Sequence, residues 1–385
     1  MTNISSTSIL FLSFILVGWI YRSGRSLSEL KKAPTLKLTA TVSRQGRVSI
    51  LIPAKNEEKN IADCVTPFLS QLREGDELLV INNGSTDRTE AILRELGAIE
   101  IRTNGPSGNP QAKFKYLNTP PTPKDWTGKN YALHLGIEHV TGDWLLFTDA
   151  DTRHEPGSLA SALNFAETNK LDLLTLLPRC LAHGFWEELI QPCAMAYMGL
   201  WFPIRKTNDP KSKIHFANGQ YLLLRAGHHR KIGGHNAVKE AFLEDFALMK
   251  KTKEMGARAL CAFGMEIYGT RMYDSFDAIW RGWRRIFLHA FDQKPGTILK
   301  CVLSVFCFSV LPFIVFSVTS GHSALSLLIG VPILGIIFAT AIKAYSIVKA
   351  RKRYALLHPL AAIVFTAILF DAFRMALLKH PTHWR

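Results

Sequence analysis

The chain has 385 residues, of which 48% are hydrophobic, and its 46 Lys and Arg against 31 Asp and Glu give a formal net charge of +15. Basic residues gather beside long apolar runs, which favours attraction to anionic lipid headgroups. The sequence has no zinc-finger or RNP-type motif, which argues against a nucleic-acid partner. None of its six cysteines forms a CxxC pair, so neither a disulfide framework nor a zinc site is predicted.

The first apolar run covers residues 8–21 and is followed, rather than preceded, by basic residues. A cleaved signal peptide has the opposite polarity and ends at small residues. We therefore expect an uncleaved membrane anchor at residues 1–22, with the chain after it in the cytoplasm.

Strands and helices are predicted to alternate after this anchor. We expect strands at 48–54, 77–82, 99–104, 144–147 and 220–225, helices at 57–72, 86–96 and 127–140, and a loop at 105–124. This alternation is typical of an α/β domain with a mostly parallel sheet. Such sheets bind their ligands at the carboxyl ends of the strands.

Two carboxylates, Asp149 and Asp151, follow the apolar strand at 144–147. On an extended chain, residues two apart point to the same side. Neighbouring carboxylates repel, so the pKa of one should rise unless a cation lies between them. A divalent ion shared with substrate phosphates would relieve the repulsion. The alternative is a solvated turn that carries two acids.

Two other strands end in polar segments, at 53–58 and 82–87, which should meet the aspartates at one edge and form a nucleotide pocket. The sequence contains neither GxGxxG nor GxxxxGK[ST], so a dinucleotide site and a P-loop are not supported. Lys129 begins a helix that Thr127 should cap. A helix start with an ammonium group is suited to an anion, although a solvated lysine is the alternative.

Five motifs occur in order: SILIPAKNEE, VINNGSTDRT, DWTGKNYALHLG, GDWLLFTDADTRH and LEDFALMKKTKEMG. Together they resemble the membrane-anchored family 2 glycosyltransferases, over roughly residues 45–290. The string RMYDSFDAIWRGW is most similar to carotenoid and terpenoid-lipid glycosyltransferases, and less closely to the hopanoid-associated group. The resemblance implies an α/β, GT-A nucleotide-diphospho-sugar transferase fold with an N-terminal membrane anchor and C-terminal transmembrane helices.

The resemblance also implies a site. Asp149 and Asp151 would bind Mg²⁺ or Mn²⁺ on the donor diphosphate, and Asp245 of the Glu244–Asp245 pair would be the general base. The alternative is that Glu244 and Asp245 stabilise the N-terminus of a helix, where acidic side chains are favoured by the helix dipole. The two interpretations are compatible. The residues expected to bind the donor are Pro53, Asn56, Glu57, Asn83, Ser85, Lys129, Asp149, Arg281 and Arg284.

Two departures from the family pattern bear on the substrate. Asn83 replaces the aspartate that usually contacts the base, but an amide can still bond an imide edge, so uridine remains the expected base. The Gln-x-x-Arg-Trp string of polymer-making members is replaced by Trp280-Arg281-Gly282-Trp283-Arg284-Arg285. We therefore expect a single transfer and not processive synthesis.

Residues 276–298 are predicted to form an amphipathic interfacial segment, because aromatic residues recur at helical spacing with three arginines between them. Those arginines would meet lipid phosphates, or alternatively hold the donor diphosphate. Apolar spans follow at 299–319, 323–348 and 355–378. The last contains Asp371 and Arg374, which can pair at i,i+3. Lys379 and Arg385 would end up outside if it spanned the membrane, so a re-entrant or surface helix is an alternative there.

These expectations define four parts: an anchor at 1–22, a catalytic domain at 45–275, the interfacial segment, and a transmembrane region at 299–385. The expected function is inverting transfer of a hexose, with glucose favoured, from a UDP-hexose to a membrane terpenoid lipid such as a carotenoid. The alternatives are a polyprenyl-phosphate glycosyltransferase and a non-catalytic nucleotide-sugar-binding membrane protein. The expected location is the inner, cytoplasmic membrane, multi-pass, with the catalytic domain in the cytoplasm.

Overall fold

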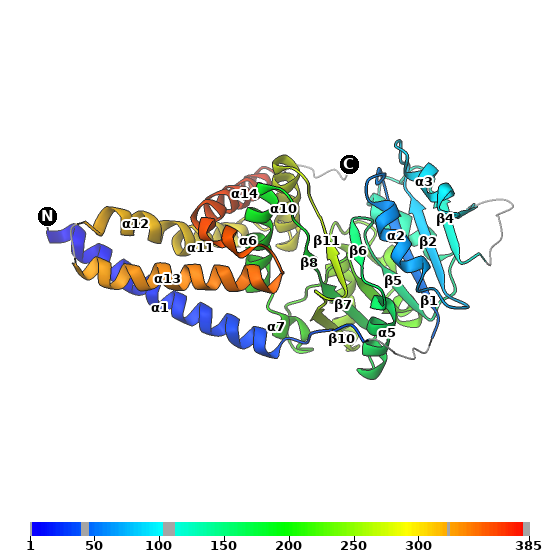
Figure 1. Cartoon of the computed structure of the whole chain (residues 1–385), viewed down its shortest axis with the longest axis horizontal. Helices are drawn as coiled ribbons and strands as arrows, with labels where there is room; N and C mark the ends of the chain where they lie inside the picture. Colours follow the sequence, from blue (N-terminus) through cyan, green and yellow to red (C-terminus); the bar gives the residue numbers. More distant parts are fainter. Residues whose placement is uncertain (1, 40–45, 103–111, 322–323, 380–385) are drawn as a thin grey trace. The chain divides into compact units, whose positions relative to one another are not determined.

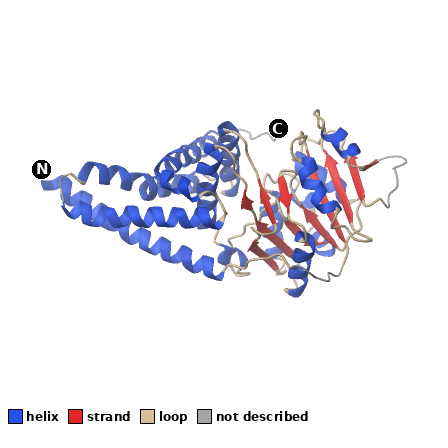
Figure 2. Cartoon of the chain, viewed as in Figure 1, coloured by secondary structure: helices blue, strands red, loops and turns tan. Residues whose placement is uncertain are grey.

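The computed structural model describes residues 2–39, 46–102, 112–321 and 324–379. The chain divides into two compact units. A helical unit contains Met1–Lys32, Cys180–Pro203 and Met272–His383, and an α/β unit contains Ala33–Arg179 and Ile204–Arg271. Strands belong to the α/β unit and long helices to the other, as the colours of Figure 2 show.

The α/β unit is built on an eight-stranded sheet with the order β10-β7-β9-β5-β1-β2-β4-β3. Its strands are β1 (Val48–Ala54), β2 (Glu77–Asn82), β3 (Ile99–Ile101), β4 (Phe114–Asn118), β5 (Trp144–Phe147), β7 (Leu173–Leu177), β9 (Leu222–Arg225) and β10 (Ala259–Phe263). All neighbours are parallel except that β9 runs antiparallel to β5 and β7. A small second sheet contains β6 (Thr152–His154), β11 (Tyr268–Thr270) and β8 (Arg179–Cys180).

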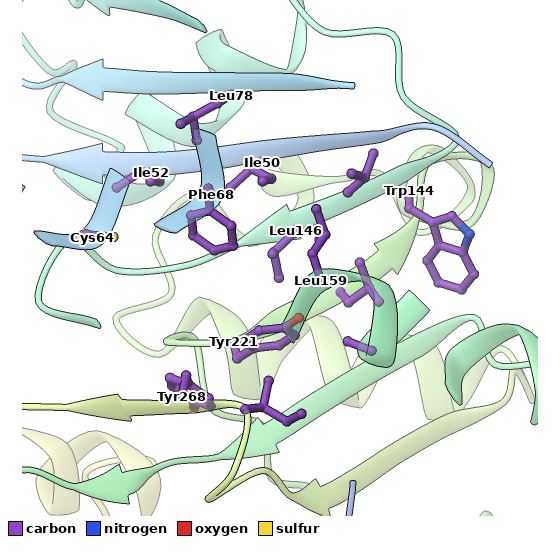
Figure 3. Close-up of a cluster of buried hydrophobic side chains, with 14 of the residues drawn as sticks. Ile50, Ile52, Cys64, Phe68, Leu78, Trp144, Leu146, Leu159, Tyr221 and Tyr268 are labelled. Carbon is purple, nitrogen blue, oxygen red and sulfur yellow. The ribbon is translucent and has the colours of Figure 1, made fainter. Parts of the chain in front are cut away.

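Helices cover both faces of the large sheet (Figure 1). They are α2 (Ile61–Leu69), α3 (Thr89–Glu95), α4 (Gly128–Ile137), α5 (Ser158–Thr168), α7 (Ile204–Asn208), α8 (Ala226–Lys231), the 3-10 helix η1 (His235–Val238) and α9 (Glu244–Glu254). Alternate residues of β1 face opposite sides: Ile50 and Ile52 join the core under α2 and α5, whereas Leu51 joins the core under α4 and α9. Figure 3 shows the first core, where Phe68 of α2 and Leu159 of α5 meet the sheet.

The predicted alternation is confirmed, but six strands were not predicted: β4, β6, β7, β8, β10 and β11. β4 lies inside the segment that was predicted to be a loop. The predicted loop is rich in Pro, Gly and Asn, which is typical of a loop, and β4 with Lys115 at its second position lies within it. In the folded chain Lys115 is buried and its Nζ lies 2.6 Å from Oε2 of Glu77 on the neighbouring β2, so the charge is paired inside the sheet.

Several predicted boundaries also differ. The helix expected from residue 57 begins at Ile61, because Asn56 has a left-handed φ of 57° and the chain turns before the helix. The helix expected from residue 86 begins at Thr89. The strand expected at 99–104 ends at Ile101, and residues 103 and 104 lie outside the described part of the chain.

The helical unit contains α1 (Thr2–Lys32), α6 (Phe185–Trp201), α10 (Phe276–Ala290), α11 (Pro295–Val305), the π-helical turn η2 (Phe306–Val310), α12 (Leu311–Thr319), α13 (Ala324–Ile347), η3 (Lys352–Leu357) and α14 (His358–Leu378). Three of its segments are long and apolar enough to cross a membrane: Pro295–Thr319, Ala324–Ile347 and Lys352–Leu378. They coincide with the three spans expected from the sequence.

Hydrogen bonds fix the direction of α1 against its neighbours. Trp19 Nε1 donates to the Phe308 carbonyl at 2.7 Å, and Arg22 Nη2 donates to Ser304 Oγ at 2.8 Å, so α1 runs antiparallel to α11 and η2. The hydroxyl groups of Ser23 and Thr340 lie 3.1 Å apart, while Leu12 and Ile15 pack in one cluster with Ile333 and Ile337. The helix α1 is therefore parallel to α13.

The last helix, α14, runs antiparallel to α11. Near its end, Ala372 and Ala376 pack with Leu288 and with Ile298, which lies near the start of α11. Earlier in the helix, Phe365 stacks on Tyr197 with ring centroids 5.2 Å apart. The Tyr197 hydroxyl in turn lies 2.5 Å from that of Ser309, in η2. The start of α11 and the end of α14 thus lie side by side.

A charged cluster joins α10 to α14. Asp371 accepts hydrogen bonds from Trp280 Nε1 at 2.9 Å, from Arg284 Nη1 at 2.9 Å and from Arg374 Nη2 at 3.1 Å. The predicted pairing of Asp371 with Arg374 is therefore confirmed, and a residue of the amphipathic helix shares the same carboxylate.

Candidate active site

Asp149 and Asp151 lie in a turn directly after β5. The expectation that they lie on extended chain is therefore wrong. The Thr152 backbone N–H and hydroxyl both donate to the Asp149 carbonyl, at 3.3 and 2.7 Å, and so close the turn. The pKa of Asp151 is raised well above its ordinary value, first by burial and then by the charges of Asp149 and Glu57. The expected repulsion between neighbouring acids is thus present in the structure.

Lys129 joins this turn to the predicted base region. Thr127 caps α4 as predicted, since its side chain accepts from the Asn130 N–H, and this fixes Lys129 in the first turn. The Lys129 Nζ lies 2.7 Å from Asp149 Oδ1 and 2.7 Å from Glu244 Oε1. Burial lowers the pKa of Lys129, but the charges of Asp149 and Glu244 outweigh it and hold the pKa above its ordinary value, so the lysine stays charged.

Glu244 and Asp245 are the first two residues of α9, so the helix N-terminus interpretation is confirmed, while the role of Asp245 as a base stays a prediction. Asp245 accepts from the Gly219 N–H at 2.7 Å through Oδ2, and from the Phe246 N–H at 2.8 Å through Oδ1. Burial and then the charge of Glu244 raise the pKa of Asp245 to about 7, against the opposing influence of Lys129. A carboxylate with this pKa is suited to general-base chemistry near neutral pH.

Gly219 brings the three side chains of this cluster close together. A methyl group at Gly219 would lie 3.1 Å from Glu244 Oε1, 3.1 Å from Lys129 Nζ and 3.4 Å from Asp245 Oδ2. In the structure the Gly219 N–H holds the predicted base.

The other predicted donor residues of the α/β unit lie at the ends of β1 and β2. Pro53 is in β1 beside Ile81 of β2, in parallel register. The Asn56 N–H donates to Ser85 Oγ at 2.9 Å, and the Thr119 hydroxyl donates to Asn83 Oδ1 at 2.9 Å. The two strand ends are thus tied together, as the sequence predicted.

Glu57 adds a further acid beside the aspartate turn. It accepts from Asn60 Nδ2 at 2.9 Å, and burial raises its pKa. The charge of Asp149 raises the same pKa further. With Asp149 and Asp151, this places three acids in electrostatic contact at one edge of the sheet.

The fit of a divalent ion can be judged from the side chains. Over the described residues, no group of three or more His, Cys, Asp or Glu side chains is arranged as a metal site. However, Asp151 Oδ1 is buried without a hydrogen-bond partner. Two aspartates would leave several positions of a hard ion open, and diphosphate oxygens are the ligands such an ion takes. The residues therefore fit an ion that arrives with the donor.

Arg281 and Arg284, also assigned to the donor, belong to the helical unit. Arg281 Nη1 lies 2.6 Å from Asp277 Oδ2, one helical turn away, and Arg284 is bonded to Asp371. Their contact with the donor, or with lipid phosphates, stays a prediction.

The chain resembles known glycosyltransferases in sequence and in fold. Residues 49–233 match Glycosyl transferase family 2. The 4,4'-diaponeurosporenoate glycosyltransferase of Staphylococcus aureus (strain MRSA252) is 24% identical over 266 residues, which cover 67% of this chain. The chain spans about two thirds, 66%, of that relative's length.

The fold has a solved counterpart. The mannosyltransferase PcManGT from Pyrobaculum calidifontis, solved in complex with GDP-Man and Mn²⁺, superposes with a TM-score of 0.56 at 15% identity. The match covers 98% of this chain and all of that one (100%). The chain therefore has the GT-A fold, its residues 49–233 resemble a glycosyl transferase family 2 domain, and its apolar C-terminal helices fit a membrane anchor.

Proposed function

We propose that the chain is an inverting glycosyltransferase that moves a hexose, with glucose favoured, from a nucleotide sugar to a membrane terpenoid lipid such as a carotenoid. The observation that carries this proposal is the Lys129 bridge, which holds the metal-binding turn and the Glu244–Asp245 pair in one buried cluster. A single base beside a donor-diphosphate site is what inverting transfer needs. The S. aureus relative, whose name gives 4,4'-diaponeurosporenoate as its substrate, supports the acceptor class.

Each part of the cluster has a role in this proposal. A bound Mg²⁺ or Mn²⁺ would neutralise charge on the departing diphosphate. Asp149 and Asp151 would hold that ion, and Pro53, Asn56, Glu57, Asn83 and Ser85 would line the nucleoside side. Asp245 would accept the proton of an acceptor hydroxyl, and Lys129 would keep the neighbouring acids from repelling the donor. We keep uridine as the expected base.

The helical unit would present the lipid. The direction of α1 places its basic end, residues 22–32, beside the end of α13, where residues 349–353 are also basic. Basic residues mark the cytoplasmic face of a membrane protein. We therefore propose that the chain lies in the inner membrane, with α1 as an additional membrane helix, and that both basic ends face the cytoplasm. The nucleotide sugar would bind from that side.

Mass spectrometry of lipids from cells that produce the native chain, Asp149→Ala or Asp245→Asn tests the proposal. We expect a hexosylated apolar lipid in the native cells and none with Asp149→Ala. Loss of the product with Asp245→Asn indicates a hydroxyl acceptor, because a carboxylate or phosphate acceptor is already an anion and needs no base. Lipids unchanged by the native chain would favour the non-catalytic alternative.

The chemistry of the bond separates the remaining acceptors. A sugar ester formed on a carboxyl group is released by mild alkali, whereas a sugar phosphate, formed on a polyprenyl phosphate, is released by mild acid. A glycoside of a hydroxyl group resists both treatments. Release by mild acid alone would replace the terpenoid acceptor with the polyprenyl-phosphate alternative.

A further inference from the structure

A buried polar network lies directly beneath the aspartate turn, and the sequence analysis did not identify it. His154 Nε2 lies 2.8 Å from the Thr152 hydroxyl and 3.1 Å from the Thr148 hydroxyl. Thr148 and Thr152 are almost fully buried, at 1% and 0% exposed, and His154 is 5% exposed. These three side chains frame the loop that carries Asp149 and Asp151.

The protons of this network can be assigned from its partners. The Thr152 hydroxyl donates to the Asp149 carbonyl and the Thr148 hydroxyl donates to the Gln220 carbonyl, both at 2.7 Å. Carbonyl oxygens only accept, so each threonine has already used its single proton. His154 Nε2 must therefore carry the hydrogen and donate it to the hydroxyl groups. His154 Nδ1 is then unprotonated, and it is buried without a hydrogen-bond partner.

Aromatic rings hold this imidazole in place. Its centroid lies 4.2 Å from that of Phe68 and 5.5 Å from that of Tyr268, to which it is nearly parallel at 11°. Burial, and then the nearby charge of Arg153, lower the pKa of His154 to about 3. The ring therefore stays neutral and its donor keeps one direction through the pH range in which enzymes of this kind work.

The same network reaches the predicted base. Gln220, whose carbonyl accepts from Thr148, follows Gly219, whose N–H holds Asp245. The Gln220 side chain is fixed in turn, because its Nε2 donates to the Thr270 hydroxyl at 3.0 Å. A continuous set of hydrogen bonds thus runs from the carbonyl of Asp149, through Thr152, His154 and Thr148, to the segment that holds Asp245.

We propose that His154 is a positioning residue, which acts through Thr152 and Thr148 to hold the metal-binding turn at a fixed distance from the turn that carries the base. This inference rests on the proposed function, because it assumes that Asp149 binds the ion. His154 touches neither ion nor substrate. Instead, His154 orients the hydroxyl groups of Thr152 and Thr148. Loss of a residue that orients metal ligands typically lowers metal affinity by about 10- to 100-fold.

Mn²⁺ binding to the purified full-length chain, measured from the free-ion electron paramagnetic resonance signal with and without UDP or GDP, tests the proposal. His154→Phe keeps the ring stack but removes the donor, and we expect it to weaken Mn²⁺ binding about 10-fold or more. Thr152→Val removes the hydroxyl at nearly constant volume and should have the same effect. His154→Gln keeps an N–H donor and should recover most of the affinity.

Thr252→Val is a matched control. Thr252 is also buried and its hydroxyl also lies near an imidazole, that of His228 at 3.1 Å, but the bonds shown for this pair do not join the aspartate turn. It should lower the melting temperature as much as Thr152→Val while leaving Mn²⁺ affinity unchanged. If His154→Phe cannot be purified in a folded form, comparing the Mn²⁺ affinity of Thr152→Val with that of Thr252→Val still tests the proposal.

Three results would overturn the proposal in distinguishable ways. Native Mn²⁺ affinity in His154→Phe or Thr152→Val, with affinity lost in Asp149→Ala, would remove His154 from the site but leave the proposed function standing. Failure of His154→Gln to recover affinity would indicate that the ring matters only for packing. Equal Mn²⁺ binding by the native chain and Asp149→Ala, or none by either, would overturn the metal assignment and this inference together.

Discussion

The ammonium group of Lys129 lies 2.7 Å from a carboxylate oxygen of Asp149, so a cation is already present beside the turn that is predicted to bind a divalent ion. The same nitrogen reaches Glu244, next to Asp245. A charge change at Asp149 should therefore be felt at the predicted base. If the proposed roles of Asp149 and Asp245 hold, this relationship couples donor binding to proton transfer through one side chain.

Replacing Lys129 with methionine should move the pH dependence of the reaction. The lysine charge lowers the pKa of Asp245, so its removal raises that pKa above about 7. With a hydroxyl acceptor, the midpoint of kcat/KM should shift to higher pH, by about one unit or more, whatever happens to the maximal rate. Lys129→Arg keeps the charge and is the matched control. An unchanged midpoint in Lys129→Met would contradict the coupling.

With a hydroxyl acceptor, kcat/KM of the native chain should rise about tenfold per pH unit and level off above pH 7, because Asp245 must be ionised to accept a proton. Asp245→Asn should lower kcat at least about 100-fold. A profile that is flat from pH 5 to 9 would show that Asp245 is not the base.

The raised pKa of Asp245 also predicts an effect on stability. The folded state binds this proton more tightly than the unfolded state, whose carboxyl has the ordinary pKa of 3.8. The resulting stabilisation is fully present below pH 3.8 and is lost as pH rises through about 7. Asp245→Asn should therefore raise the melting temperature by several degrees at pH 8, and by much less at pH 4. Equal shifts at both pH values would argue against a buried, proton-binding carboxyl group.

Asp149→Ala and Asp151→Ala should each abolish transfer while leaving the chain folded, since turn carboxylates add little to the core. Asp151→Ala should even be neutral or stabilising, because it removes a buried acid with a raised pKa. Melting temperatures and transfer rates in the presence and absence of a chelator check this. Full turnover in excess chelator would be incompatible with metal dependence.

The arginines of α10 have two competing roles that can be separated. Changing Arg281, Arg284 and Arg285 to glutamine should reduce activity on a membrane-embedded acceptor several-fold, with little effect on a short soluble analogue, if they meet lipid phosphates. Equal loss on both acceptors, with a higher KM for the nucleotide sugar, would place them in the donor site. Asp371→Asn is a useful companion, because it removes the charge that pairs with Arg284 and Arg374 and leaves the three arginines of α10 in place.

The direction of α14 predicts the location of the C-terminus. In the proposed topology, α13 ends and α11 begins at the cytoplasmic face. The end of α14 lies beside the start of α11, so the segment 352–378 should enter and leave the membrane at that same face. A green fluorescent protein fused after Lys379 should fluoresce, and alkaline phosphatase fused there should be inactive. A phosphatase fusion after Ser320, between α12 and α13, should be active. Active phosphatase after Lys379 would show that α14 spans the membrane.

The parts of the fold that depend on local pattern were predictable from the sequence. Strands β1, β2 and β5 are apolar runs with polar ends, and parallel topology brings those ends to one edge, so Asn83 and Asp149 could be assigned to one site. Strand β4 was not predicted because it lies in a segment rich in Pro, Gly and Asn, and its buried Lys115 is paired with a residue distant in sequence, Glu77.

The site beyond that edge depends on tertiary contacts. Proximity of Glu244 and Asp245 to Asp149 was expected only from family resemblance, and the Lys129 bridge was not foreseen. The role we assign to His154 also has no local signature, because its partners are defined by the turn and by Gln220. The string TDADTRH does contain all three side chains of the network, so two threonines and a histidine around the aspartates were the available signal.

The most direct test is transfer by the purified full-length chain in lipid nanodiscs that contain a bacterial lipid extract, with UDP-hexose labelled in the sugar. We predict Mn²⁺-dependent label in the organic phase with the native chain, none after Asp149→Ala, and none after chelation. GDP-hexose serves as a second donor, so that a wrong prediction of the donor's nucleobase is not mistaken for an inactive enzyme. Label that stays in the aqueous phase for both donors, or that enters the lipid equally with Asp149→Ala, would contradict metal-dependent glycosyl transfer to a membrane lipid.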